Sequence, residues 1–156
     1  GDVYKRQPLA DAAPMGLARV VRAGDDATLI TYGAMVTTAL QAAEAAEDEG
    51  ISLEVIDLRS LSPVDYDTVA TSVRKTGRVV VAHEASREAG MAAEVIASVT
   101  ERCFEYLESA PLRVTGHDVP YPPAKLEKYH LPDLDRLLDA VDRVLDRPNS
   151  LTGADA

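Results

Sequence analysis

Residues 78–100, RVVVAHEASREAGMAAEVIASVT, decide the fold of this chain. The stretch begins with a β-branched run at 79–82, passes through the polar pair His83-Glu84 into a short loop, and ends in a segment with apolar residues at steps of three and four. A β-branched run without alternation is typical of a strand buried on both faces. The order strand, loop, helix is typical of a parallel α/β sheet. We therefore expect 79–82 to be the central strand and the other elements to be its neighbours.

Length and composition indicate one globular domain. The chain has 156 residues, of which 46% are hydrophobic and 27% charged, which is ordinary for a globular protein. No window approaches the roughly 18 consecutive apolar residues of a membrane span, and no secretory leader is evident. The single cysteine, Cys103, falls on an apolar helix face and is expected to be a core residue rather than a nucleophile or a ligand. These features favour a cytoplasmic protein that does not associate with membranes.

The charge of the chain bears on its partners. The formal net charge is −10, whereas nucleic-acid binding needs basic patches, so nucleic acid is not an expected partner. An acidic surface would instead favour the docking of a basic protein module.

The chain divides into four parts. Residues 1–7 match nothing that follows and are interpreted as a tag or an artefactual leader, and residues 8–17, with two prolines and a glycine, as a linker. Residues 18–147 form the predicted domain, and residues 148–156 the predicted disordered tail.

The first two predicted strands, 18–22 and 28–32, are separated by the turn 23–26, a spacing that predicts an antiparallel hairpin at a sheet edge. Ser62 supplies a hydroxyl cap and Pro63 a proline in the first turn, which predicts a helix that begins there and ends at Gly77. The other predicted elements are helix 35–49, strand 53–57, strand 79–82, the helix up to Cys103, strand 112–116 and helix 133–146. This order predicts a three-layer α/β/α sandwich, with a five-stranded, mostly parallel sheet and one antiparallel edge strand.

Ligands of open α/β sheets gather beyond the carboxyl ends of the strands. His83-Glu84 is the best acid–base candidate there, because a carboxylate beside an imidazole can raise its pKa. Neighbours along a strand point to opposite faces, however, so a structural or interface role is favoured over catalysis. The same interpretation applies to His117-Asp118. No zinc, calcium, phosphate-loop or nucleophile-elbow motif is present, and the residues alone indicate no active site.

Four segments together resemble a known family. They are ARVVRAGDDATLITYGAMV (18–36), LEVIDLRSLSPVDYDTV (53–69), the stretch from VVVAHEA to HDVPYP (79–122) and KYHLPDLDRL (128–137). In order and spacing they are similar to the carboxyl-terminal domain of the β subunit of thiamine-diphosphate-dependent 2-oxo acid dehydrogenases, within the transketolase superfamily. The HEA form at 83–85 is more similar to the branched-chain or broad-specificity members than to the pyruvate enzymes.

The resemblance implies a fragment of an enzyme that oxidatively decarboxylates a 2-oxo acid and transfers the acyl group to a lipoyl group. In that family, an amino-terminal domain of the β subunit and the α subunit hold thiamine diphosphate and Mg. We therefore expect this chain to bind no cofactor or metal, to have no catalytic residue and to be inactive alone. The implied partners, within an α2β2 assembly, are a second β subunit, an α subunit and the peripheral-subunit-binding domain of the dihydrolipoyl acyltransferase.

The resemblance also implies three partner-binding residues. Glu108, in YLESAPLR, matches an acidic position that some relatives use to bind the basic domain of the acyltransferase. His83 and Glu84 match the HEA motif, for which a subunit contact or a loop-ordering role is inferred. Exposed apolar surface left by absent neighbours predicts self-association.

Two alternatives remain open. The first is a free-standing, non-catalytic interaction module with the same fold. The second is a relative of the transketolase or deoxyxylulose-phosphate synthase branches, which the RVTGHDVPYP segment fits less well.

Overall fold

Strand β2 (Ala27–Thr31) is the middle strand of the sheet, and every one of its residues is buried. The structure, a computed structural model, describes residues 14–146, in which five strands have the order β1-β3-β2-β4-β5. Strand β4 (Val79–Ala82) is buried on both faces, as predicted, but it lies second from the edge and not at the centre. Parallel pairing of β2 with both β3 (Leu53–Asp57) and β4 makes β2 the centre of the sheet.

The predicted hairpin is wrong. Strand β1 (Arg19–Arg22) is an antiparallel edge strand, as expected, but it pairs with β3 and not with β2. The turn after β1 crosses the beginning of β3, where Ser52 O accepts hydrogen bonds from the amides of Asp25 and Asp26 at 3.0 and 2.9 Å. At Gly24 the two backbones are so close that a Cβ atom would lie 2.2 Å from the carbonyl carbon of Leu53. This crossing holds β3 between β1 and β2.

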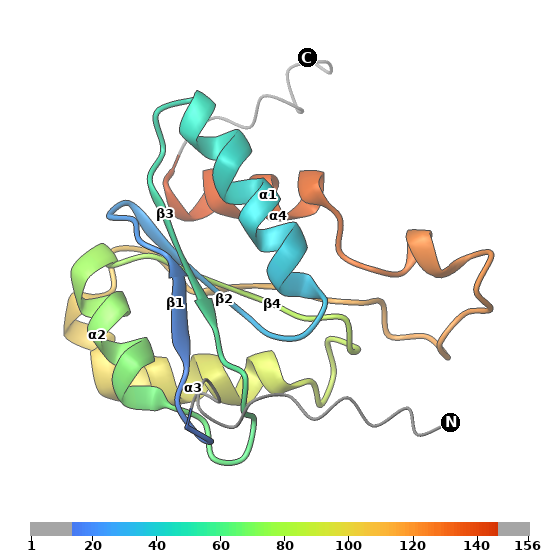
Figure 1. Cartoon of the computed structure of the whole chain (residues 1–156), viewed down its shortest axis with the longest axis horizontal. Helices are drawn as coiled ribbons and strands as arrows, with labels where there is room; N and C mark the ends of the chain where they lie inside the picture. Colours follow the sequence, from blue (N-terminus) through green and yellow to red (C-terminus); the bar gives the residue numbers. More distant parts are fainter. Residues whose placement is uncertain (1–13, 147–156) are drawn as a thin grey trace, which may run out of the picture.

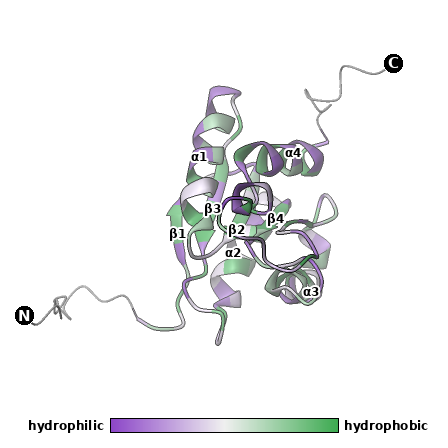
Figure 2. Ribbon diagram, turned by 90° about the vertical axis from the view of Figure 1, so that its right-hand side faces the viewer, coloured by the Kyte–Doolittle hydropathy of each residue, from purple (hydrophilic) through white to green (hydrophobic). Residues whose placement is uncertain are grey.

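Four helices cover the two faces of the sheet in the described residues, and the predicted three-layer sandwich is confirmed (Figure 1). Helices α1 (Met35–Asp48) and α4 (Leu134–Val144) pack on one face, and α2 (Tyr66–Thr76) and α3 (Met91–Cys103) on the other. Figure 2 shows the mostly hydrophobic strands between the two helical layers. Cys103 is buried between the sheet and the helices α2 and α3, as expected. The fifth strand, β5 (Leu112–Val114), forms the other sheet edge and ends earlier than predicted.

The start of α2 also differs from the prediction. Asp65, and not Ser62, is the N-cap residue, and its carboxylate accepts hydrogen bonds from Thr68 N, Thr68 Oγ1 and Ala18 N. Burial alone would raise the pKa of Asp65, but these hydrogen bonds outweigh it and lower the pKa. A carboxylate both caps the helix and interacts with its positive end, so Asp65 is the stronger start signal.

Three of the predicted parts fall wholly or partly outside the described residues. Residues 1–7 and 148–156 lie outside them, and only 14–17 of the proposed linker lie within them. The proposed leader, linker and tail therefore stay predictions. No helix between residues 14 and 146 is both long enough and apolar enough to cross a membrane.

Glu54 is a buried charge that ties the sheet to α2. Its side chain is 6% exposed, and Oε2 lies 2.5 Å from Nζ of Lys75, while Gly24 N donates to the same oxygen at 3.4 Å. Burial alone would raise the pKa of Glu54, but the hydrogen bonds from Lys75 and Ser72 outweigh it and lower the pKa. The carboxylate therefore joins β3, α2 and the β1–β2 crossing.

Replacement of Glu54 by Gln should lower the free energy of unfolding by about 1–2 kcal/mol at pH 7, because Lys75 loses the nearer of its two carboxylate partners and retains only Asp25 at 3.5 Å. Because folding lowers the pKa of Glu54, its carboxylate stabilises the folded state fully at pH values above the unfolded-state pKa of about 4.5. This stabilisation is lost as the pH falls through the folded-state pKa. The difference between wild type and Glu54→Gln in urea unfolding should therefore shrink at low pH. Glu44→Gln, on the exposed face of α1, is the matched control. A difference that stays constant from pH 7 to pH 3 would contradict the prediction.

Candidate functional site

The three residues expected to bind partners lie at opposite ends of the sheet. His83 and Glu84 follow the carboxyl end of β4. Glu108 lies at the amino end of the same strand, where its amide donates to Gly77 O at 2.8 Å. A four-residue strand is about 13 Å long, so the two groups cannot belong to one site. The structure therefore presents two separate candidate surfaces.

His83 is part of the internal packing at the carboxyl end. Its side chain is fully buried, and neither ring nitrogen has a hydrogen-bond partner within the described part of the chain. The ring fills the space left by Gly90, where a Cβ atom would lie 2.7 Å from His83 Cε1. Burial lowers the pKa of His83, so the imidazole is neutral near pH 7. The neutral ring of His83 is therefore enclosed beneath the loop that follows β4.

Glu84 and Tyr32 lie beside this buried ring. Tyr32 follows β2, and its ring centroid is 6.1 Å from that of His83. Burial, together with the charge of Glu84, raises the pKa of Tyr32. Glu84 itself is half-buried. The carboxyl ends of the parallel strands β2 and β4 thus lie side by side at one end of the sheet.

Residues 117–131 leave the sheet after β5 and form a projection that we call the arm (orange in Figure 1). His130, 4% exposed, packs against Gly116 and Tyr121 and holds the base of the arm. A Cβ atom at Gly116 would lie 2.5 Å from His130 Nε2. Asp118 Oδ1 accepts a hydrogen bond from Glu88 N at 2.8 Å, which joins the arm to the loop after β4. The arm is therefore anchored at the carboxyl ends of the strands, where His83 also lies.

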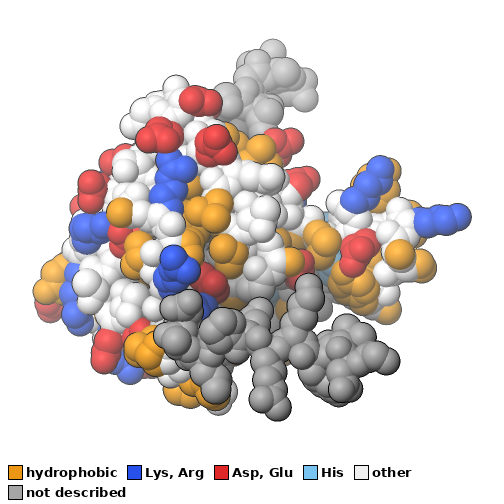
Figure 3. Space-filling view, in the orientation of Figure 1, with side chains coloured by type: hydrophobic (Ala, Val, Ile, Leu, Met, Phe, Trp, Pro, Cys, Tyr) orange, Lys and Arg blue, Asp and Glu red, His pale blue; other side chains and the backbone are white. Residues whose placement is uncertain are grey.

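The arm exposes apolar side chains. Val119, Tyr121, Leu126 and Tyr129 are 54%, 60%, 52% and 68% exposed. Figure 3 shows hydrophobic side chains together with basic and acidic ones on the lobe that projects from the body. Tyr121 donates a hydrogen bond to Glu127, which raises the pKa of Tyr121 to about 12. Contiguous exposed apolar surface marks an interaction site. These residues are not among those singled out from the sequence, although prolines interleaved with tyrosines in VPYPPAKLEKY were the available signal.

Glu108 belongs to a second surface, which we call the amino-end patch and define as Phe104, Tyr106 and Glu108. Phe104 and Tyr106 are 72% and 50% exposed and lie in the short 3-10 helix η2 (Phe104–Tyr106) after α3. Glu108 Oε2 lies 2.5 Å from Nη2 of Arg78, and the Glu108 side chain remains 58% exposed. The guanidinium carbon of Arg74 lies 5.7 Å from the Tyr106 ring centroid, so the amino-end patch combines two exposed rings and an accessible carboxylate with neighbouring arginines.

No group of three or more His, Cys, Asp or Glu side chains between residues 14 and 146 is arranged to hold a metal ion. The loops ITYGAM and EAGMAAE, at the carboxyl ends of the strands, contain one glycine each and lack the glycine-rich motifs of phosphate-binding loops.

Comparisons with known proteins agree with this architecture. The sequence profile of the family described as "Transketolase, C-terminal domain" matches residues 16–137. Among solved structures, a chain described as "Split gene transketolase, inactive beta4 tetramer" is similar, with a TM-score of 0.68 and 36% identity. The similarity covers 84% of this chain and 42% of that chain.

Two relatives are β subunits of dehydrogenases. The pyruvate dehydrogenase E1 component subunit beta of Leifsonia xyli subsp. xyli is 53% identical over 137 residues, which are 88% of this chain and 41% of that protein. The 3-methyl-2-oxobutanoate dehydrogenase subunit beta of Mycobacterium tuberculosis is 54% identical over 136 residues, 86% of this chain and 39% of that protein. The chain thus spans about two fifths of the length of the curated relatives it matches. Almost equal identity to both relatives leaves the expected branched-chain preference a prediction.

The buried state of His83 predicts a pH-dependent stability. A histidine with a lowered folded-state pKa favours the unfolded state as pH falls below about 6.5, because only the unfolded chain takes up the proton there. Between pH 7.5 and pH 5.5, wild type should lose up to about 1 kcal/mol more unfolding free energy than a His83→Phe variant. Urea unfolding followed by circular dichroism measures this difference. Equal losses in the two proteins would show that His83 is not held neutral.

Proposed function

This chain belongs to the transketolase C-terminal domain family, and on that premise we propose that it is the carboxyl-terminal domain of the β subunit of a 2-oxo acid dehydrogenase. The observation that carries the proposal is 53–54% identity to two such β subunits over 86–88% of this chain. Oxidative decarboxylation of a 2-oxo acid, with acyl transfer to a lipoyl group, would belong to the whole cytoplasmic assembly. Thiamine diphosphate and Mg would bind to other parts of that assembly.

The contribution of this domain is proposed to be assembly. The arm supports the proposal because it places four exposed apolar side chains on a support anchored by His130 and Asp118. The surface fits a neighbouring β or α subunit, since apolar residues with a few charges at the rim are typical of lasting subunit contacts. The similar solved chain is described as a β4 tetramer, which agrees with self-association through this domain. His83 and Glu84 would act indirectly, by ordering the loop that Asp118 joins to the arm.

The second part of the proposed role is docking of the acyltransferase core. The amino-end patch supports it, because Phe104 and Tyr106 supply apolar contact area beside the Glu108 carboxylate. The peripheral-subunit-binding domain is basic in the family that this chain resembles, and the net charge of −10 would attract it. Arg78 would then share Glu108 with the partner or release it.

Self-association through the arm is the first test. The full chain should sediment as a dimer or a larger species at about 50 μM. The double variant Leu126→Ser/Tyr129→Ser should sediment as a monomer, because it removes two exposed apolar side chains of the arm. Sedimentation velocity measures the change. Leu17→Ser, at an exposed site away from the arm, is the control and should associate like wild type. A monomeric wild-type chain at high concentration would refute this assembly role.

Docking through Glu108 is the second test, with a purified basic peripheral-subunit-binding domain of an acyltransferase as the probe. Glu108→Gln should weaken binding about tenfold by calorimetry, since one interfacial charge contact is removed. Folding should be little affected, because an exposed ion pair such as Arg78–Glu108 contributes at most about 1 kcal/mol.

Glu94→Gln is the matched control. Glu94 is exposed in the first turn of α3, toward the other end of the sheet, and the variant has the same change in charge. Equal binding of the domain by wild type, Glu94→Gln and Glu108→Gln would place docking elsewhere.

A further inference from the structure

A cavity of about 380 Å³ lies where α4 packs beside the edge strand β5. We call it the arginine pocket, because four arginines contribute to its lining. The complete lining is Arg87, Leu112, Arg113, Val114, Asp135, Arg136, Asp139, Ala140 and Arg143. Such a volume is within the range of small-molecule sites.

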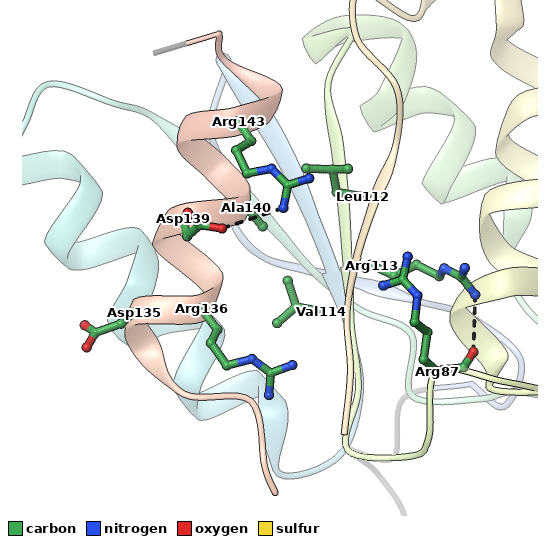
Figure 4. Close-up of a pocket in the computed structure, with 9 residues that line it drawn as sticks. All are labelled: Arg87, Leu112, Arg113, Val114, Asp135, Arg136, Asp139, Ala140 and Arg143. Atoms are coloured by element: carbon green, nitrogen blue, oxygen red, sulfur yellow. Dashed lines mark hydrogen bonds and ion pairs between the residues drawn. The ribbon is translucent and has the colours of Figure 1, made fainter. Parts of the chain in front are cut away.

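The arginine pocket is positively charged within an acidic chain. Four arginines and two aspartates line the cavity, but Figure 4 shows the Arg113 side chain extending away from α4, toward Arg87 O. Figure 4 also shows that the Asp135 side chain points away from the cavity. Without Arg113 and the outward-pointing Asp135, three guanidinium groups and one carboxylate remain, an excess of two positive charges in a chain whose net charge is −10. Asp139 forms an ion pair with Arg143 at 3.7 Å. The field inside the cavity therefore favours an anion.

The arginines approach from two sides of β5. Figure 4 shows Arg136 and Arg143 extending from α4 toward the strand, while the Arg87 side chain reaches it from the loop after β4. A planar carboxylate is saturated by one or two guanidinium forks. A tetrahedral phosphate group has oxygens in several directions and suits guanidinium groups that arrive from opposite sides.

Two of these side chains are already positioned. Arg136 Nη2 donates to Thr115 O at 2.6 Å, and Arg113 Nη1 donates to Arg87 O at 3.2 Å. Nη1 of Arg136 is buried and has no hydrogen-bond partner in the described part of the chain. A buried donor without an acceptor destabilises the folded state, and an oxyanion in the cavity would supply the acceptor. Positioning of this kind also reduces the entropy lost on binding.

We propose that the arginine pocket binds a small anion that carries a phosphate group. A phosphate monoester has a charge of about −1.5 to −2 at pH 7, which matches the excess positive charge of the lining. Leu112, Val114 and Ala140 form an apolar wall for a short organic body attached to the phosphate. The site is independent of the proposed subunit identity, because it consists only of residues of this chain.

The test is calorimetric titration of the full chain with inorganic phosphate, pyrophosphate and citrate, each against sodium chloride of equal ionic strength. Pyrophosphate and phosphate should bind with about millimolar or tighter dissociation constants, and citrate more weakly. Arg143→Gln and Arg87→Gln should each weaken pyrophosphate binding about fivefold or more, since each removes one charged donor. These two exposed arginines can be replaced without disturbing the core.

Arg19→Gln is the control, with the same loss of charge on the exposed edge strand β1 at the far side of the sheet. Unchanged pyrophosphate binding by this variant, with weakened binding by the other two, supports the site. Equal weakening in all three variants would show an adventitious ion only and overturn the proposal. No measurable phosphate or pyrophosphate binding would also overturn it, and tighter binding of citrate than of pyrophosphate would overturn the assignment to phosphate.

Discussion

The structure depends on β2 having a parallel neighbour on each side. A strand buried at all five residues must satisfy its backbone groups by pairing, and β2 does so through β3 and β4. The side chains support the same arrangement, because Thr28 Oγ1 lies 2.7 Å from both Ser72 Oγ and Thr76 Oγ1 of α2. Insertion of β3 beside β2 displaces β1 to the edge. All other elements, including the two ends at which the candidate surfaces lie, take their places from this central pairing.

Much of this fold is readable from local sequence patterns. The β-branched run at 79–82 predicts a buried strand, and the periodic apolar residues predict four helices with errors of a few residues at their ends. Strand pairing is less readable, because a four-residue turn is compatible with a hairpin or with a crossing over a third strand. The choice depends on the close approach of Gly24 to Leu53, a contact between distant parts of the sequence that leaves no local signal. The start of α2 differs for a similar reason, since Ser62 and Asp65 are both good caps and only the contact with Ala18 favours Asp65.

The candidate sites show the same limit. His83 and Glu84 are candidates both from their place after a predicted strand and from the family resemblance, and Glu108 from the resemblance alone. Only the structure shows that Glu108 lies at the opposite end of β4 from the other two. The buried ring of His83 could not be foreseen, because burial depends on Gly90 and the loop packed over it. The arginine pocket has no signal along the chain, since Arg87, Arg136 and Arg143 come from distant segments and the total charge is negative. Folding, and not composition, creates the local positive field.

The crossing of the first turn over β3 has a consequence for synthesis of the chain. Strand β1 pairs with β3, which ends at Asp57, so its partner is made only after β2 and α1. A nascent chain leaving the ribosome must keep β1 extended and unpaired until β3 emerges. Non-local pairing of this kind slows folding. The short, arginine-flanked strand RVVR is suited to that delay, because its charged ends discourage premature association with other nascent chains.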